Sequence, residues 1–150
     1  MLHRKITISL LVIAVLATGT ASSGVRAAEP RLSKRDRMLQ LLNRTRRNHG
    51  LPAFRLNLEL SSQAWRHSKR MAERNQLFHT ANLYETVKAW SPSTWGENVG
   101  AARWLKRVRA LWMKSGGHRD NILNPRFRRI GIGVVKARGL VWVTTIFYGG

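Results

Sequence analysis

Apolar residues recur at helical spacing along the first part of the chain, beginning just after Ser33. The apolar positions of this first stretch are Met38, Leu41 and Leu42. They follow the i, i+3, i+4 pattern of a helix that is buried along one face. Ser33 stands three residues before Asp36, the spacing at which a serine caps a helix and an acidic side chain reaches back to the cap. The pattern predicts a helix over about 34–49, which Gly50 ends.

Two further stretches repeat this pattern. The second begins at Asn57, a preferred capping residue, and predicts a helix to about Asn75. The third covers 104–115, and its apolar stripe is made of Trp104, Leu105, Val108, Leu111 and Trp112. Ser115 falls on the same stripe. Two glycines follow this stretch, and His118 then begins a short turn or helix. The segment 78–92, between the second and third stretches, shows no clear period and predicts a long connection or a weak helix.

The end of the chain has the composition of a β-hairpin. Residues 130–135 and 140–147 are rich in β-branched and aromatic residues, and four residues separate them. Gly131 and Gly133 lie two apart, so they share one strand face and allow close packing there. Helices come first and antiparallel strands last, which predicts a single α+β layered domain.

The N-terminus resembles a secretory signal peptide over residues 1–27. A basic start is followed by an apolar run from Ile6 to Ala17, then by small residues ending at Ala27. That run is too short for a transmembrane anchor. We therefore expect a signal peptide (1–27), a short leader (28–32), a domain (33–150) and a secreted or periplasmic location. The chain has no cysteine, which excludes disulfides and a lipidated cysteine.

Positive charge dominates the exported part. Of the 27 Lys and Arg residues, three lie in the predicted signal peptide, so 24 remain against seven acidic residues, a net charge of +17. Such a surface is attracted to polyanions. For an exported protein the expected partners are lipid head groups, lipopolysaccharide phosphates and wall polymers. Many of these charges also simply solvate helix faces.

Three groups able to share a cation or a proton lie in short polar stretches: His79, Glu97 and His118. Two neutral imidazoles and a carboxylate suit a divalent ion such as Zn²⁺. The same groups also suit proton transfer, because an adjacent carboxylate orients an imidazole. Their separations, 18 and 21 residues, match no local metal motif. From spacing alone, His79 as a helix-end residue and His118 as an exposed turn residue remain open, and His67 is interpreted as a partly buried structural histidine.

Several short segments along nearly the whole exported chain resemble one known family. They are Asn43–Leu51, Leu60, Ala64, Met71–Ala72, His79, Gly96–Val99, Trp112, Gly117–Leu123, Ile130–Val134 and Val143–Phe147. In this order they are similar to the CAP superfamily of cysteine-rich secretory proteins, antigen 5 and pathogenesis-related class 1 proteins, also called SCP domains. The chain resembles the short bacterial secreted members.

The resemblance implies a three-layer α-β-α sandwich around a small antiparallel sheet. It also implies a central cleft, lined by two histidines and two acidic residues, that can hold a divalent cation such as Zn²⁺ or Mg²⁺. His79, Glu97 and His118 match that set, but Ser115 stands where the family usually has its second acidic residue. One carboxylate fewer predicts weaker cation binding. Asn98 is expected either to bond across the cleft or to hold its own loop.

Three functions follow as alternatives. The first is a binding module for a small or lipidic ligand or a divalent cation, held on anionic envelope surfaces by its charge, with no established enzymatic activity implied. The second is a secreted hydrolase using Ser115, His118 and Glu97, although no nucleophile-elbow motif surrounds Ser115. The third is a metal-dependent nuclease, which rests on the positive charge and on His118 near Asn121. Nothing here resembles a nucleic-acid-binding fold.

Overall fold

The computed structural model describes residues 31–150. The predicted signal peptide (1–27) and most of the predicted leader (28–32) lie outside the described residues, so both stay predictions. The elements in chain order are α1 (Lys34–Asn48), β1 (Arg55–Leu56), α2 (Leu58–Arg74), α3 (Leu83–Val87), the 3₁₀ turn η1 (Lys88–Trp90), β2 (Thr94–Ala102), α4 (Leu105–Lys114), α5 (Gly116–Leu123), β3 (Arg129–Ala137) and β4 (Leu140–Gly149). No helix in this part of the chain is long and apolar enough to cross a membrane.

Both predicted helix caps are present. Ser33 Oγ accepts a hydrogen bond from the Asp36 backbone amide at 3.1 Å and starts α1. Asn57 Oδ1 accepts one from the Leu60 amide at 3.0 Å and starts α2. Each cap satisfies an amide that has no partner inside its own helix. The starts of α1 and α2 therefore follow from local sequence.

The predicted hairpin is confirmed as β3 and β4. The two strands pair in antiparallel register and are joined by Arg138 and Gly139, whose φ angles are 51° and 73°. Left-handed backbone at both positions gives the turn a twist that matches the flanking strands. The sheet order is β1-β3-β4-β2, with β2 antiparallel to β4. The two-residue β1 pairs parallel to β3, so the sheet is mixed and the prediction of a small antiparallel sheet is corrected at that edge.

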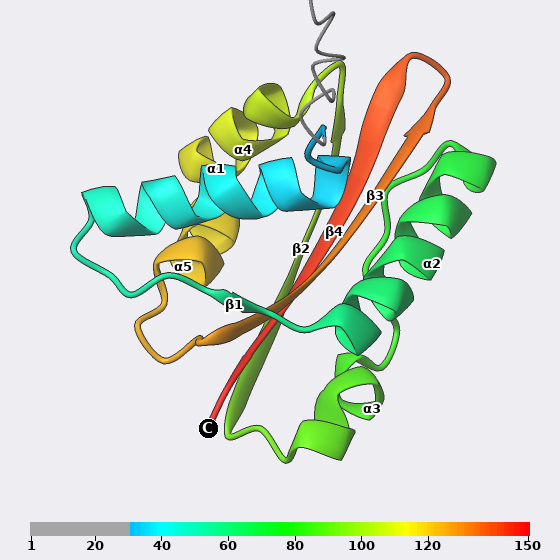
Figure 1. Cartoon of the computed structure of the whole chain (residues 1–150). Coiled ribbons are helices and arrows are strands. Elements are labelled where there is room, and N and C mark those ends of the chain that lie inside the picture. The colour runs from blue at the N-terminus through cyan, green and yellow to red at the C-terminus, as the bar shows by residue number, and fades with distance from the viewer. Residues whose placement is uncertain (1–30) are drawn as a thin grey trace, which may run out of the picture. The chain divides into compact units, whose positions relative to one another are not determined.

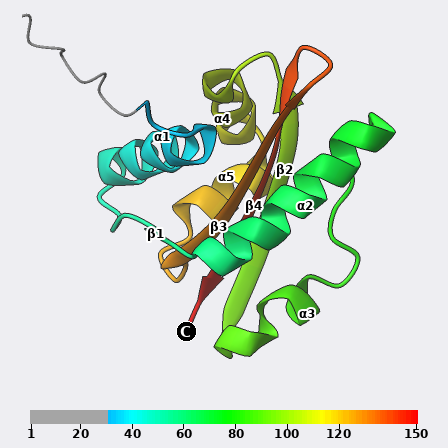
Figure 2. The same ribbon diagram turned by 45° about the vertical axis from the view of Figure 1, so that its right-hand side comes forward.

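Helices cover both faces of the sheet, as the three-layer prediction requires. Helix α2 lies along β3 and β4 on one side, while α1, α4 and α5 lie on the other (Figure 1). Figure 2 shows the same separation after a 45° turn. Close approach on the α2 side depends on Gly133, because a Cβ there would lie 2.1 Å from the Ala64 carbonyl carbon. The two predicted glycines thus allow the α2 backbone to rest on β3.

Strand β2 is the element that the sequence pattern does not reveal. Residues Thr94–Ala102 form the outer edge of the sheet, beside β4. Glycines and polar residues interrupt any alternation of apolar side chains in this segment. The irregular stretch before it, for which the sequence predicts a connection or a weak helix, contains α3 and η1.

Arg46, a fully buried cation, joins α1 to the segment that follows α5. Its guanidinium donates to the backbone oxygens of four residues: Pro52 (2.7 Å), Ile122 (2.8 Å), Asn124 (2.9 Å) and Phe127 (3.1 Å). The guanidinium carbon also lies 4.0 Å from the centre of the Phe54 ring. Burial, followed by the nearby Arg128 charge, lowers the pKa of Arg46 to about 10, so it stays charged at neutral pH. The arginine therefore satisfies carbonyls that no helix or strand pairs.

Candidate functional site at the edge of β2

Glu97 and Asn98 lie next to each other in β2 and face opposite sides of the sheet. Side chains alternate along a strand. The even-numbered positions face α4 and α5, because a Cβ at Gly96 would meet Asn121 and a Cβ at Gly100 would meet Trp112. Glu97 therefore faces the side of α2 and α3. Since β2 is an edge strand, groups from both helical layers can approach it.

Glu97 binds two residues of the segment that follows α2. His79 Nδ1 lies 2.7 Å from Glu97 Oε1. The Thr80 amide donates to the same oxygen at 3.0 Å, and the Thr80 hydroxyl donates to Oε2 at 2.6 Å. The Glu97 side chain is 3% exposed whereas that of His79 is 62% exposed. Glu97 is thus a buried carboxylate that holds an exposed imidazole, and Thr80 is a partner that the sequence did not suggest.

His118 and Ser115 form a second pair, at the junction of α4 and α5. Ser115 ends α4 and precedes the first residue of α5, and its Oγ lies 2.9 Å from His118 Nδ1. The His118 ring also stacks on Trp112, with ring centres 6.2 Å apart. Burial, and then the positive charge of nearby His79, lowers the pKa of His118. His118 is therefore neutral at pH 7 and is free to donate or accept one hydrogen bond through Nε2.

Asn98 and Asn121 hold α5 against β2. Asn98 Nδ2 donates to the His118 backbone oxygen at 2.9 Å. Asn121 Nδ2 donates to Asn98 Oδ1 at 2.9 Å and to the Glu97 backbone oxygen at 3.2 Å. Asn98 was expected either to bond across the cleft or to hold its own loop. The structure has the first arrangement, since Asn98 bonds to His118 on α5. The Asn121 amide therefore joins α5 to β2.

His67, on α2, lies deeper than its sequence position suggested. It is 2% exposed, and its Nδ1 lies 3.1 Å from Thr144 Oγ1. Its Nε2 has no hydrogen-bond partner among the described residues. Burial lowers its pKa, while the charge of Glu97 opposes that shift. His67 is therefore a buried neutral imidazole behind the Glu97 carboxylate, and its structural interpretation holds with more burial than predicted.

The three predicted metal ligands do not form one set. Within residues 31–150 no group of three or more His, Cys, Asp or Glu side chains is placed to hold a metal ion. Glu97 is occupied by His79 and Thr80, so it is positioned to orient His79 rather than to bind a cation itself. Each exposed or half-buried imidazole keeps its Nε2 available, because Nδ1 is already bonded. Cation binding by His79 and His118 stays a prediction, and the geometry gives a metal-dependent nuclease no support.

A pocket of about 240 Å³ lies beside the Ser115–His118 pair. Its walls are Leu77, Val99, Gly100, Ala101, Val108, Leu111, Trp112, Ser115 and His118. Two of these, Leu77 and Leu111, are exposed apolar side chains at 48% and 42%. His79 and Glu97 are not part of this lining. The pocket nevertheless reaches the segment after α2 through Leu77, and the charge of His79 acts on His118, so the His79–Glu97 and Ser115–His118 pairs lie near each other at the edge of β2. A single cleft shared by His79, Glu97 and His118 stays a prediction.

Known proteins are similar to this chain in sequence and in fold. The sequence model of the CAP family, described as the cysteine-rich secretory protein family, matches residues 39–147. The uncharacterized protein YkwD of Bacillus subtilis is 33% identical over 132 residues, which cover 83% of this chain and 49% of YkwD. The chain thus spans about half the length of that relative.

Solved structures agree with the sequence comparison. An extracellular SCP-domain protein of Bacillus anthracis superposes with a TM-score of 0.65 at 28% identity, covering 78% of this chain and 40% of that protein. An outer surface protein of Borrelia burgdorferi superposes with a TM-score of 0.70 at 16% identity, covering 77% of this chain and 92% of that protein. The second likeness shows the fold alone. Together with the family match over most of its length, these findings show that the chain belongs to the CAP family of cysteine-rich secretory proteins.

Proposed function

We propose that the chain is an exported CAP-domain binding module that captures a small, partly apolar ligand in the pocket beside Ser115 and His118. The supporting observation is the lining of that pocket, where exposed Leu77 and Leu111 flank a half-buried Ser–His pair. Export is supported by the predicted signal peptide and by the similarity to an extracellular protein. Ligand sites with apolar walls and a few convergent polar groups are typical of small-molecule binding.

The polar end of the pocket sets the expected chemistry of the ligand. Ser115 Oγ and His118 Nδ1 bind each other, which leaves His118 Nε2 as the group that meets a ligand. Burial lowers the His118 pKa, so the neutral ring donates or accepts one hydrogen bond but offers no full charge. A ligand with a short apolar body and one hydroxyl or carboxyl group fits this lining.

Titration with octanoate, followed by amide and indole NMR shifts, tests the pocket. The indole of Trp112 is a direct reporter, since its Nε1 donates to the Val99 oxygen in the pocket wall at 2.9 Å. We expect saturable shifts at Trp112 that disappear in Leu111→Asp. Leu58→Asp is the matched control, because Leu58 is 62% exposed at the start of α2, outside this pocket. Equal shifts in both variants would reject the pocket as the site.

The excess of positive charge supports attachment to an anionic envelope surface. The predicted exported part carries +17, and acidic partners are few. Binding to lipopolysaccharide or anionic vesicles should therefore weaken steeply as salt rises, because screening shortens the range of charge attraction. Binding that does not change with salt would instead indicate apolar capture.

Divalent cation binding is a proposal with its own test. When bound, a cation such as Zn²⁺ would supply Lewis acidity beside the pocket, and His79 and His118 would hold it through Nε2. Calorimetric titration with Zn²⁺ and Mg²⁺ compares the exported protein with a His79→Ala, His118→Ala double variant. Identical curves would remove the proposal. Affinity for Zn²⁺ should fall as pH drops, because protons compete with the cation for the imidazole nitrogens.

A serine hydrolase is the second candidate because one observation favours it. Ser115 Oγ lies within hydrogen-bond distance of His118, as a nucleophile must lie to its base. The predicted orienting role of Glu97 is not supported, because its carboxylate binds His79 and Thr80 instead of His118. If the protein hydrolyses p-nitrophenyl butyrate and this activity vanishes in both Ser115→Ala and His118→Ala, the two residues act as nucleophile and base. Activity that survives Ser115→Ala would exclude these roles.

A further inference from the structure

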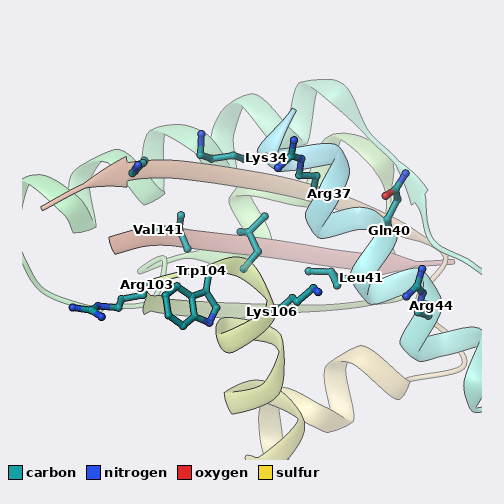
Figure 3. A pocket seen from close by; sticks show the side chains of 11 residues that line it. Lys34, Arg37, Gln40, Leu41, Arg44, Arg103, Trp104, Lys106 and Val141 are labelled. Atoms are coloured by element: carbon teal, nitrogen blue, oxygen red, sulfur yellow. The ribbon is translucent and has the colours of Figure 1, made fainter. Parts of the chain in front are cut away.

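Unpaired positive charge surrounds a second pocket, between α1 and the start of α4. The pocket has a volume of about 580 Å³. Its eleven lining residues are Lys34, Arg37, Gln40, Leu41, Arg44, Arg103, Trp104, Leu105, Lys106, Lys136 and Val141. Figure 3 shows labelled side chains from α1 along one wall and from the start of α4 along another. We call it the α1–α4 pocket.

Six cations line the α1–α4 pocket, and no acidic residue is part of its lining. They are Lys34, Arg37, Arg44, Arg103, Lys106 and Lys136. No Asp or Glu is among the described lining residues, and none of the six takes part in an ion pair within residues 31–150. Like charges that converge on one hollow repel each other, and a bound polyanion relieves this repulsion.

The helix periodicity of α1 directs its cations to this pocket. Lys34, Arg37, Leu41 and Arg44 are spaced i, i+3, i+7 and i+10, which places them on one helix face. Arginine forks bind phosphate oxygens in pairs, while lysine acts as a compact point charge. A site with both residue types therefore suits phosphate groups better than a single carboxylate.

The remaining lining residues indicate that the ligand is more than a phosphate ion. Trp104 is 59% exposed at the pocket, and buried Leu105 and Val141 form an apolar floor. An exposed indole face packs against the C–H face of a sugar ring, and the Gln40 amide can bind hydroxyl groups. A volume of about 580 Å³ also leaves space beyond one phosphate.

We propose that the α1–α4 pocket binds a sugar that carries more than one phosphate group. The inference rests on the proposed attachment to anionic envelope surfaces and names the residues and ligand chemistry responsible for it. The same chemistry is presented by free sugar bisphosphates and by the phosphorylated sugars of lipopolysaccharide. The pocket is separate from the one beside Ser115 and His118.

Calorimetric titration with glucose 1,6-bisphosphate tests the pocket directly. The triple variant Arg44→Gln, Arg103→Gln, Lys106→Gln should lose more than about tenfold in affinity, because each cation forms a charge-assisted contact. The matched control is Arg47→Gln, Arg126→Gln, Arg138→Gln, which removes the same charge from exposed positions outside the pocket. That control should change affinity by less than about threefold. Equal losses of affinity in the two triple variants would show that the α1–α4 pocket is not the binding site.

The sugar part of the proposal has its own comparison. Trp104→Ala should weaken the binding of glucose 1,6-bisphosphate, because its sugar ring contacts the indole. The same variant should bind inorganic pyrophosphate, which has no sugar ring, with unchanged affinity. Trp95→Ala is the control, because Trp95 is another exposed indole, at 41%, and lies on β2. If pyrophosphate binds as tightly as the sugar bisphosphate and Trp104→Ala has no effect, the assignment to a phosphorylated sugar is wrong.

Binding to lipopolysaccharide and to its dephosphorylated form distinguishes attachment through the α1–α4 pocket from attachment through charge spread over the whole surface. Selective loss of lipopolysaccharide binding in the pocket triple, together with loss on dephosphorylation, supports the pocket as the attachment site. If both triples lose lipopolysaccharide binding equally, attachment stands but is spread over the surface, and the pocket is rejected as its site. If lipopolysaccharide does not bind while glucose 1,6-bisphosphate still requires the pocket, the envelope attachment fails and the sugar-phosphate site remains.

Discussion

At the scale of single residues, Arg46 forms a buried hydrogen-bond network that the sequence pattern did not reveal. Arg46→Met keeps an apolar stem in the core but leaves four backbone oxygens without donors. Buried polar groups without partners are strongly destabilising, so we expect the free energy of unfolding to fall by roughly 3–5 kcal/mol. Urea denaturation measures it. Arg47→Met, at the exposed neighbour, should change it by less than about 0.5 kcal/mol. A loss of similar size in both variants would contradict this role.

His67 makes stability depend on pH, and the sign follows from its environment. Burial lowers its pKa in the folded state, so below ~6.5 the unfolded chain binds the proton first. The stabilisation is complete above ~6.5 and is lost as pH falls through the folded-state pKa. The slope can reach about 1.4 kcal/mol per pH unit for one imidazole.

Denaturant titrations at several pH values check this expectation. His67→Gln should flatten the decline just below pH ~6.5, although it also lowers stability at all pH values. His118 shares the direction of the shift but is only half-buried, so His118→Gln should flatten the decline less. An unchanged slope in His67→Gln would show that its protonation does not destabilise the fold.

The residues of the candidate site were predictable, but their partners were not. His79, Glu97, His118, Ser115 and Asn98 all lie at the edge of β2. Which group contacts which depends on the strand's alternation, because it sends Glu97 to one helical layer and Asn98 to the other. This alternation could not be used while β2 itself was unrecognised. The pairing of Glu97 with His79 and of Asn98 with His118 therefore follows from a strand that the sequence did not predict.

At the scale of elements, the helices and strands that carry a local sequence signal were predicted correctly. Caps at Ser33 and Asn57 and the apolar stripes set α1, α2 and α4, and the β-branched runs set β3 and β4. Strand β2 forms without such a signal, since its pairing with β4 over nine residues, from Thr94 to Ala102, supplies the hydrogen bonds. Tertiary pairing outweighs intrinsic propensity in such strands.

The contact between α2 and β3 gives the element-scale prediction. Gly133→Ala places a Cβ 2.1–2.2 Å from backbone atoms of Ala64 and Trp65, so α2 must move away from the sheet. We expect a loss of about 3 kcal/mol in the free energy of unfolding. Gly117→Ala is the opposite case, because nothing lies within 4 Å and the residue is in α5. That variant should gain up to about 1 kcal/mol by helix propensity. Thermal and urea unfolding measure both variants. An unchanged free energy of unfolding in Gly133→Ala would contradict the packing argument.

At the scale of the whole molecule, charge is distributed very unequally between cations and acids. Four ion pairs occur in the described chain, and one of them uses a histidine. Most Lys and Arg side chains in residues 31–150 therefore lack an acidic partner. Exposed cations of this kind favour solubility and attraction to anions, but their mutual repulsion destabilises the compact state. The protein thus depends on its core, without disulfides, to oppose that repulsion.

Salt should stabilise this fold, because it screens repulsion more than it weakens the few ion pairs. Raising NaCl from ~10 mM to ~150 mM shortens the screening length from about 30 Å to about 8 Å. We expect the melting temperature to rise by a few degrees, which calorimetry measures. The gain should be smaller in the Arg44→Gln, Arg103→Gln, Lys106→Gln triple than in the Arg47→Gln, Arg126→Gln, Arg138→Gln triple, since repulsion is greatest where cations converge. A melting temperature that falls with salt would mean that the ion pairs outweigh the repulsion.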